Sequence, residues 1–164
     1  MDFNPMSCKT SALIEDYDIT LTVNQRLSRY LLRQYDNSKS KQQQGWHSPS
    51  ILPLASWLKK LWTENTTKQR CLSAWQELNL WRQIIQTDKL NLNPIKTARH
   101  CCKAWNIITT WRIPIQELMV GDNTDIRTFA HWLNLFKEKL DNEQWVTECM
   151  IPLEINELLK TKAI

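Results

Sequence analysis

Three arginines recur along one side of the segment that follows residue 24, and their spacing suits a chemical role. Arg26, Arg29 and Arg33 are separated by three and four positions, so a helix would gather them on one stripe. Guanidinium groups bind phosphates through several N–H donors at once. The pattern predicts a cationic helix edge that could contact the phosphates of a nucleic acid. A solvated helix surface is the ordinary explanation for the same stripe.

A strand and a helix joined at Asn24 must position these arginines. Ile19, Leu21 and Val23 alternate with threonines, as in a strand with one apolar face. Asn24 is a favourable N-cap for the helix that follows. The exposed N–H groups and the positive dipole of such a helix start favour a phosphate. The expected apolar edge of this helix comprises Leu27, Tyr30, Leu31 and Tyr35.

A second short strand and another helix are predicted after a polar loop at 37–47. Ile51 and Leu52 can form the strand. Apolar residues then recur with helical spacing from Leu54 to Trp62, and this leaves Lys59 and Lys60 on the outer side. Two strands alone make an incomplete parallel sheet. We therefore expect apolar surface around 19–23 to be left bare.

Three more amphipathic helices are predicted beyond a polar connection at 63–70. Their starts are marked by a capping box at Ser73, by Asn93 before a proline, and by a breaker at 121–123. Trp75 and Trp81 are expected on the buried face of the first. The chain then ends in a weaker apolar segment that Pro152 interrupts.

The predicted fold class is mainly α with a short α/β start. Two short N-terminal strands are followed by about five amphipathic helices. We expect a loosely ordered lead-in at 1–17 and a single domain at 18–145. Residues 146–164 are expected to form a weak C-terminal helix or a truncated tail.

Length and composition describe a soluble domain. A chain of 164 residues can bury a core without disulfides or metal, and its two glycines and six prolines argue against linkers. No signal sequence and no long apolar run is visible, so we expect a cytoplasmic protein without a membrane partner. Five cysteines without framework spacing are expected to be reduced thiols. The net charge of +4 is compatible with a nucleic acid but does not require one.

No catalytic or cofactor motif is recognisable. The segment from Ser7 to Thr10 lacks the glycines that a phosphate-binding loop needs. His100, Cys101 and Cys102 are consecutive, so a helix would turn them to different sides and away from a common metal. We expect no enzyme activity from the chain alone, no cofactor and no metal. Two alternatives stay open: a Cys or His site assembled in three dimensions, and a helical protein-interaction module built on the nine tryptophans.

Several motifs occur in the order seen in one known family. They comprise Leu21 to Leu31, Trp46 to Leu54, Trp57, Leu58, Ser73, Gln76, Glu77, Leu80, Trp81, the run from Ala104 to Trp111, Phe129 and Trp132. In this order they resemble the N-terminal region of bacterial proteins described as probable DNA repair proteins. These are relatives of the AddB-type helicase/nuclease subunits, whose distant C-terminal part carries a PD-(D/E)XK nuclease. Members are several times longer, so the chain is expected to be a truncated or frameshifted member, with a non-functional relic as a further alternative.

The resemblance implies a function for the strand-to-helix corner. In helicase-like folds of superfamily 1, a strand that ends in Thr and Asn before a helix is similar to the segment that touches single-stranded DNA. Carried over, this implies contact with the DNA backbone by Thr22, Asn24 and Arg26, with Arg29 beside them. Such contacts position a strand without reading its sequence.

The function expected from these observations is weak, sequence-independent binding of single-stranded DNA by a non-catalytic fragment. A helicase/nuclease subunit is a second expected partner. The candidate DNA-binding residues are Thr22, Asn24, Arg26, Arg29, Arg33, Lys59 and Lys60.

Overall fold

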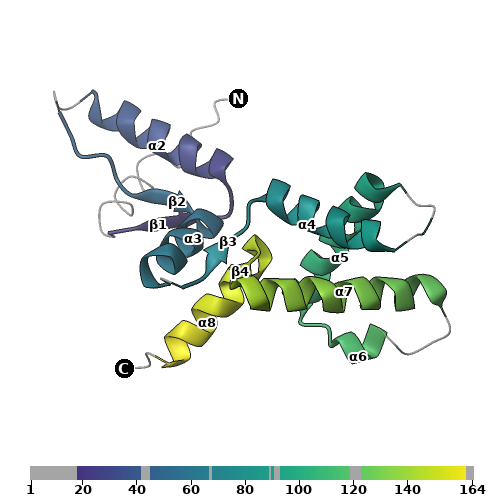
Figure 1. The fold of residues 1–164 in the computed structure, drawn as a ribbon. Coiled ribbons are helices and arrows are strands. Elements are labelled where there is room, and N and C mark those ends of the chain that lie inside the picture. Colours follow the sequence, from purple (N-terminus) through teal and green to yellow (C-terminus); the bar gives the residue numbers. More distant parts are fainter. Residues whose placement is uncertain are drawn as a thin grey trace. The chain divides into compact units, whose positions relative to one another are not determined.

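The computed structural model describes residues 18–41, 45–66, 68–88, 90, 93–118 and 123–161. Seven α-helices and four very short strands make up this part of the chain, which confirms the predicted mainly helical class (Figure 1). None of these helices has the length and apolar character that crossing a bilayer requires. The expected lead-in at 1–17, residues 121–122 of the breaker and the last three residues lie outside the described part. The chain divides into two compact units between Leu61 and Trp62, whereas the sequence predicts one domain over 18–145.

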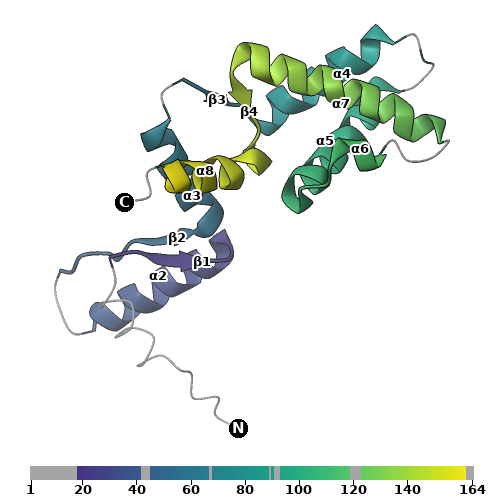
Figure 2. The same ribbon diagram turned by 90° about the horizontal axis from the view of Figure 1, so that it is seen from below.

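The first unit is built on a two-stranded parallel sheet. Thr20 pairs with Ile51, and the Thr20 N–H donates to the carbonyl of Ser50 at 2.8 Å. In both views the two strands lie between the two helices of this part of the chain (Figures 1 and 2). Both predicted strands and their parallel pairing are thus confirmed. The elements are β1 (Thr20–Thr22), α2 (Gln25–Lys39), β2 (Ile51–Pro53) and the part of α3 (Leu54–Asn65) that comes before Trp62.

Helix α2 packs on the threonine-bearing face of β1, and the apolar face stays open. Thr22 is only 5% exposed, and it meets the buried Ser28 of the helix. Leu21 is exposed, and Val23 is 85% exposed. The expectation of bare apolar surface around 19–23 is confirmed, because α2 covers only the threonine-bearing side of β1.

The predicted apolar edge of α2 is only partly correct. Tyr35 is buried against Ile51, with Leu31 packed beside it. Leu27 is exposed, however, and Tyr30 is 54% exposed. The period of 3.6 residues gives the faces of a helix, but the packing partner selects which face is buried. Here the buried face is centred nearer to Ser28 than the spacing of large apolar residues suggests.

Two helices run further than predicted. Helix α2 continues through Lys39, into the loop that was expected from Asn37. Helix α3 continues through Asn65, into the expected connection at 63–70. The backbone bond from Ser40 N–H to the carbonyl of Asp36, 2.9 Å long, closes the last turn of α2. Each residue added to a helix forms one more backbone hydrogen bond, and this offsets the modest helix propensity of the polar residues.

The second unit consists of helices and a short parallel ladder. The helix starts predicted at Ser73, Asn93 and Asn123 are all present, each with its side chain accepting a backbone N–H bond. At Ser73 the complete capping box forms. The elements are β3 (Arg70–Cys71), α4 (Ala74–Thr87), α5 (Pro94–Trp111), α6 (Ile115–Leu118), α7 (Thr124–Glu143), β4 (Trp145–Val146), the 3-10 helix η1 (Glu148–Met150) and α8 (Ile151–Thr161).

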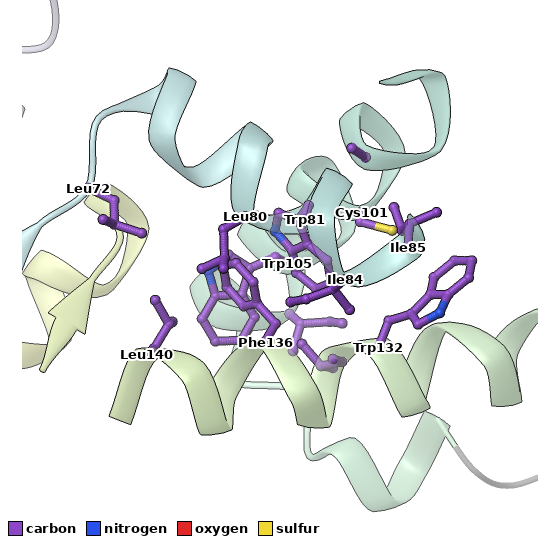
Figure 3. Packing of buried hydrophobic residues seen from close by; sticks show 13 residues of the cluster. Leu72, Leu80, Trp81, Ile84, Ile85, Cys101, Trp105, Trp132, Phe136 and Leu140 are labelled. Atoms are coloured by element: carbon purple, nitrogen blue, oxygen red, sulfur yellow. The ribbon is translucent and has the colours of Figure 1, made fainter. Parts of the chain in front are cut away.

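Aromatic rings from α4, α5 and α7 form the centre of the second unit (Figure 3). Trp81 stacks on Phe136 with ring centroids 4.0 Å apart, and Trp105 meets the same Phe136 edge-on at 5.6 Å. The indole N–H of Trp105 donates to Thr147 Oγ1 at 2.9 Å. These tryptophans therefore serve packing, as expected. Trp75 does not, because it is 68% exposed in the first turn of α4, beyond the face that its neighbours cover.

The segment after 145 belongs to the second unit and contains a C-terminal helix, which was one of the two predicted alternatives for 146–164. Strand β4 pairs with β3, with Trp145 opposite Arg70. Val146 and Thr147 are buried. Pro152 lies in the first turn of α8, where its missing N–H costs no helical bond, and so it does not interrupt the helix. Helix α8 buries Ile151 and Ile155.

Candidate nucleic-acid interface

A network of hydroxyl groups holds the corner between β1 and α2. Thr22 Oγ1 lies 2.7 Å from Ser28 Oγ, 3.1 Å from the carbonyl oxygen of Asn24 and 3.3 Å from that of Leu52. Ser28 can donate to Thr22, which leaves the Thr22 proton for a carbonyl. Because Thr22 is buried and fully engaged, its side chain holds the corner and is not presented to a ligand.

Asn24 caps helix α2, as predicted. Its backbone is extended, and its Oδ1 accepts the N–H of Leu27 at 2.9 Å. The Ser28 N–H reaches the Asn24 carbonyl at 3.2 Å. The N–H groups of Gln25 and Arg26 come before the first helical bond and have no acceptor among the described residues. Asn24 is itself exposed, so this helix start is open to solvent.

The three predicted arginines share the outer face of α2. Arg26, Arg29 and Arg33 are all exposed. Within the described part of the chain, none of the three forms an ion pair. The single acidic residue of α2, Asp36, accepts the indole N–H of Trp46 at 2.9 Å. The structure therefore presents three guanidinium groups whose charge no described carboxylate neutralises.

The two predicted lysines lie elsewhere. Lys59 and Lys60 are exposed on α3, which lies on the other side of the strands from α2 (Figures 1 and 2). Each has an interaction within the protein. The structure does not bring them onto the arginine face, since the sheet separates the two helices. Sequence distance gave no sign of this, because helices flanking one strand can cover either face.

A pocket of about 550 Å³ in the second unit brings a cysteine and a histidine together. His100, Cys101 and Asp125 are among its lining residues. Burial raises the pKa of the Cys101 thiol to about 11. A catalytic cysteine needs a thiolate, which a lowered pKa supplies. The pocket therefore contains the residue types of a nucleophilic site, but the raised pKa of Cys101 disfavours the thiolate that such a site needs.

A second pocket of about 480 Å³ lies between α4, α5 and η1. Burial, above all, raises the pKa of Glu77 to about 7, and a nearby Glu148 adds to the shift. The pKa of Cys102 is raised to about 12, first by burial and then by the charge of Glu77. These cysteines are protonated at neutral pH, and no group of three metal-ligating side chains occurs in the described residues.

Comparison with known protein-family models and with curated proteins finds no match to this chain. The candidate interface therefore depends on the geometry of the β1–α2 corner.

The site also contains a residue that the sequence reading assigned elsewhere. Tyr30 was expected on the buried apolar edge, but it projects from the face that carries the arginines. Helical spacing could have revealed this, because Tyr30 follows Arg26 by four positions and precedes Arg33 by three.

Proposed function

We propose that the β1–α2 corner binds the sugar–phosphate backbone of single-stranded DNA, weakly and without sequence specificity. The chain would act as a non-catalytic N-terminal part of a helicase/nuclease-like DNA repair protein, with a helicase/nuclease subunit as a further partner. The observation that carries the proposal is the exposed face of α2, where three arginines lack ion pairs with described residues.

Two kinds of group would contact the DNA, namely backbone N–H groups and arginine side chains. The first-turn N–H groups of α2, with the positive end of the helix dipole, suit one phosphate. Arg26, Arg29 and Arg33 would contact phosphates further along the strand. Thr22 would hold the corner through its bonds to Ser28 and Asn24 and would not itself touch DNA.

The proposal predicts an affinity that falls with salt and depends on the arginines. Fluorescence anisotropy of a labelled polythymidylate strand should show binding at low salt. The double variant Arg26→Ala with Arg29→Ala should bind more weakly. It should also lower the slope of log affinity against log salt by about 1.4, because each lost phosphate contact on a single strand accounts for about 0.7.

Arg82 and Arg99 provide a matched control for that experiment. Both are exposed on helices of the second unit and have no ion pair with a described residue. Replacing both by Ala changes the net charge by the same amount as the test variant. An equal loss of affinity in this control would indicate a general charge effect and contradict the assignment to α2.

A helical protein-interaction module is the second candidate function. Two tryptophans of the second unit favour it, because Trp75 is 68% and Trp111 is 75% exposed. Ile107 is also exposed one turn before Trp111 on α5. Exposed aromatic residues of this size are typical of contact surfaces for other proteins. This candidate requires no affinity for DNA.

A further inference from the structure

Tyr30 lies along one edge of the arginine face, between Arg26 and Arg33 in the direction of the helix axis. With about 100° per residue, it lies about 40° around the helix axis from Arg26 and about 60° from Arg33. Its side chain is 54% exposed. No hydrogen bond or ring contact to another described residue engages it. Its ring is thus available from solvent beside the arginines, at a height along the helix between Arg26 and Arg33.

The other tyrosine of α2, Tyr35, packs into the core of the first unit. Tyr35 is buried with Ile51, and the ammonium group of Lys39 lies 5.6 Å from its ring centroid. Helix α2 therefore satisfies its packing with the opposite face. Core formation does not account for an aromatic ring at Tyr30.

We propose that Tyr30 stacks on an unpaired base while Arg26 and Arg33 hold the phosphates on either side of it. This inference rests on the proposed DNA-binding function and deepens it. A base presents its flat π-face whatever its identity, so stacking on tyrosine adds affinity without adding sequence preference. In a duplex these faces are already stacked on neighbouring base pairs. Tyr30 therefore makes the site selective for single strands.

The dimensions of α2 fit such an arrangement. Arg26 and Arg33 are seven residues apart, which is about 10 Å along a helix that rises about 1.5 Å per residue. A base-stacked strand, with the rise of about 3.4 Å per nucleotide of duplex DNA, would place about three nucleotides over that length, and an extended single strand would place fewer. The aromatic ring at Tyr30 lies between the ends of this interval, where the base of a middle nucleotide would turn toward the helix.

The test compares a normal strand with one that has no bases. Wild type, Tyr30→Ala and Tyr30→Phe are titrated with labelled polythymidylate and with an abasic strand of equal length, over a series of salt concentrations. On polythymidylate, Tyr30→Ala should bind about fivefold to tenfold more weakly at every salt concentration, with an unchanged salt slope. Tyr30→Phe should bind as wild type does. On the abasic strand all three proteins should bind equally.

The outcomes separate this inference from the proposed function. Equal binding of polythymidylate by Tyr30→Ala and wild type, with the arginine variant still impaired, would overturn stacking and leave backbone binding intact. Loss of affinity for both strands in Tyr30→Ala would also overturn it, since the ring would then support the helix instead of a base. Failure of every strand to bind at low salt would overturn both proposals. Photocrosslinking of a bromouracil-containing strand to Tyr30, mapped by mass spectrometry, gives an independent positive result.

Discussion

At the scale of single residues, Glu77 gives the protein a specific pH dependence. Burial raises its pKa from 4.5 to about 7 in the folded protein. Between these two values the unfolded chain has lost the proton and the folded chain keeps it. Unfolding then releases a proton, so stability falls as pH rises from about 4.5 to about 7 and stays level above.

The variant Glu77→Gln should remove this pH dependence, because an amide carries no charge to bury. Its urea midpoint should exceed that of wild type at pH values above 7, and the difference should vanish toward pH 4.5. Glu138→Gln, at an exposed position of α7, is the control and should leave the wild-type profile unchanged. Parallel profiles for wild type and Glu77→Gln would show that burial does not perturb this carboxyl.

Also at the residue scale, Thr22 shows why a residue type does not fix its role. A threonine at the end of a strand could present its hydroxyl to a ligand or turn it inward. Here the Thr22 hydroxyl turns inward, because the Ser28 hydroxyl lies 2.7 Å away and α2 covers that side of β1. The sequence contains both residues, but their contact depends on how the strand and helix pack.

At the scale of the element, the start of α2 combines a structural and a proposed binding role in Asn24. The variant Asn24→Asp separates the two. Aspartate caps a helix as well as asparagine does, so the urea midpoint should change little, whereas Asn24→Ala should cost about 1 kcal/mol. The new carboxylate would repel a phosphate at the helix start, so affinity for polythymidylate should fall in Asn24→Asp despite normal stability.

Asn93 allows the same exchange at a different helix. Its Oδ1 caps α5 by accepting the N–H of Lys96 at 3.1 Å. Asn93→Asp should therefore preserve stability and leave DNA affinity unchanged. Equal DNA affinity for Asn24→Asp and wild type would argue against a phosphate at the α2 start.

Helix starts were predictable because their signals are local. Asn24, Ser73 and Asn93 each lie next to the N–H groups that they cap, so a few residues of sequence contain the whole interaction. The faces of the elements were harder to predict. Tyr30 and Trp75 look like core residues by spacing, yet both are exposed, because burial depends on which neighbour covers each face.

At the scale of the whole molecule, the pairing of β3 with β4 was not predicted from the sequence, whereas the parallel pairing of β1 with β2 was. Strands β3 and β4 have two residues each. They pair Arg70 with Trp145, although these two residues lie far apart in the sequence. Such short strands have no periodic pattern of their own. The side of the β1–β2 sheet on which each helix lies was also not predicted, and it places Lys59 and Lys60 away from the arginines. Only the part of the candidate interface that lies on α2 could therefore be predicted from the sequence.

The proposal also assigns different surfaces to different units. The arginine face and Tyr30 lie in the first unit, and the exposed Trp75 and Trp111 lie in the second. Binding of DNA and binding of a protein partner would therefore perturb separate sets of residues. This separation makes a residue-resolved titration informative.

Heteronuclear NMR titration of the isotope-labelled protein with polythymidylate at low salt tests the central claim most directly. The account predicts shift changes in the backbone amides from Gln25 to Arg33, with the indole N–H signals of Trp75 and Trp111 unmoved. Shift changes confined to those tryptophans, or no change at any strand concentration, would contradict it.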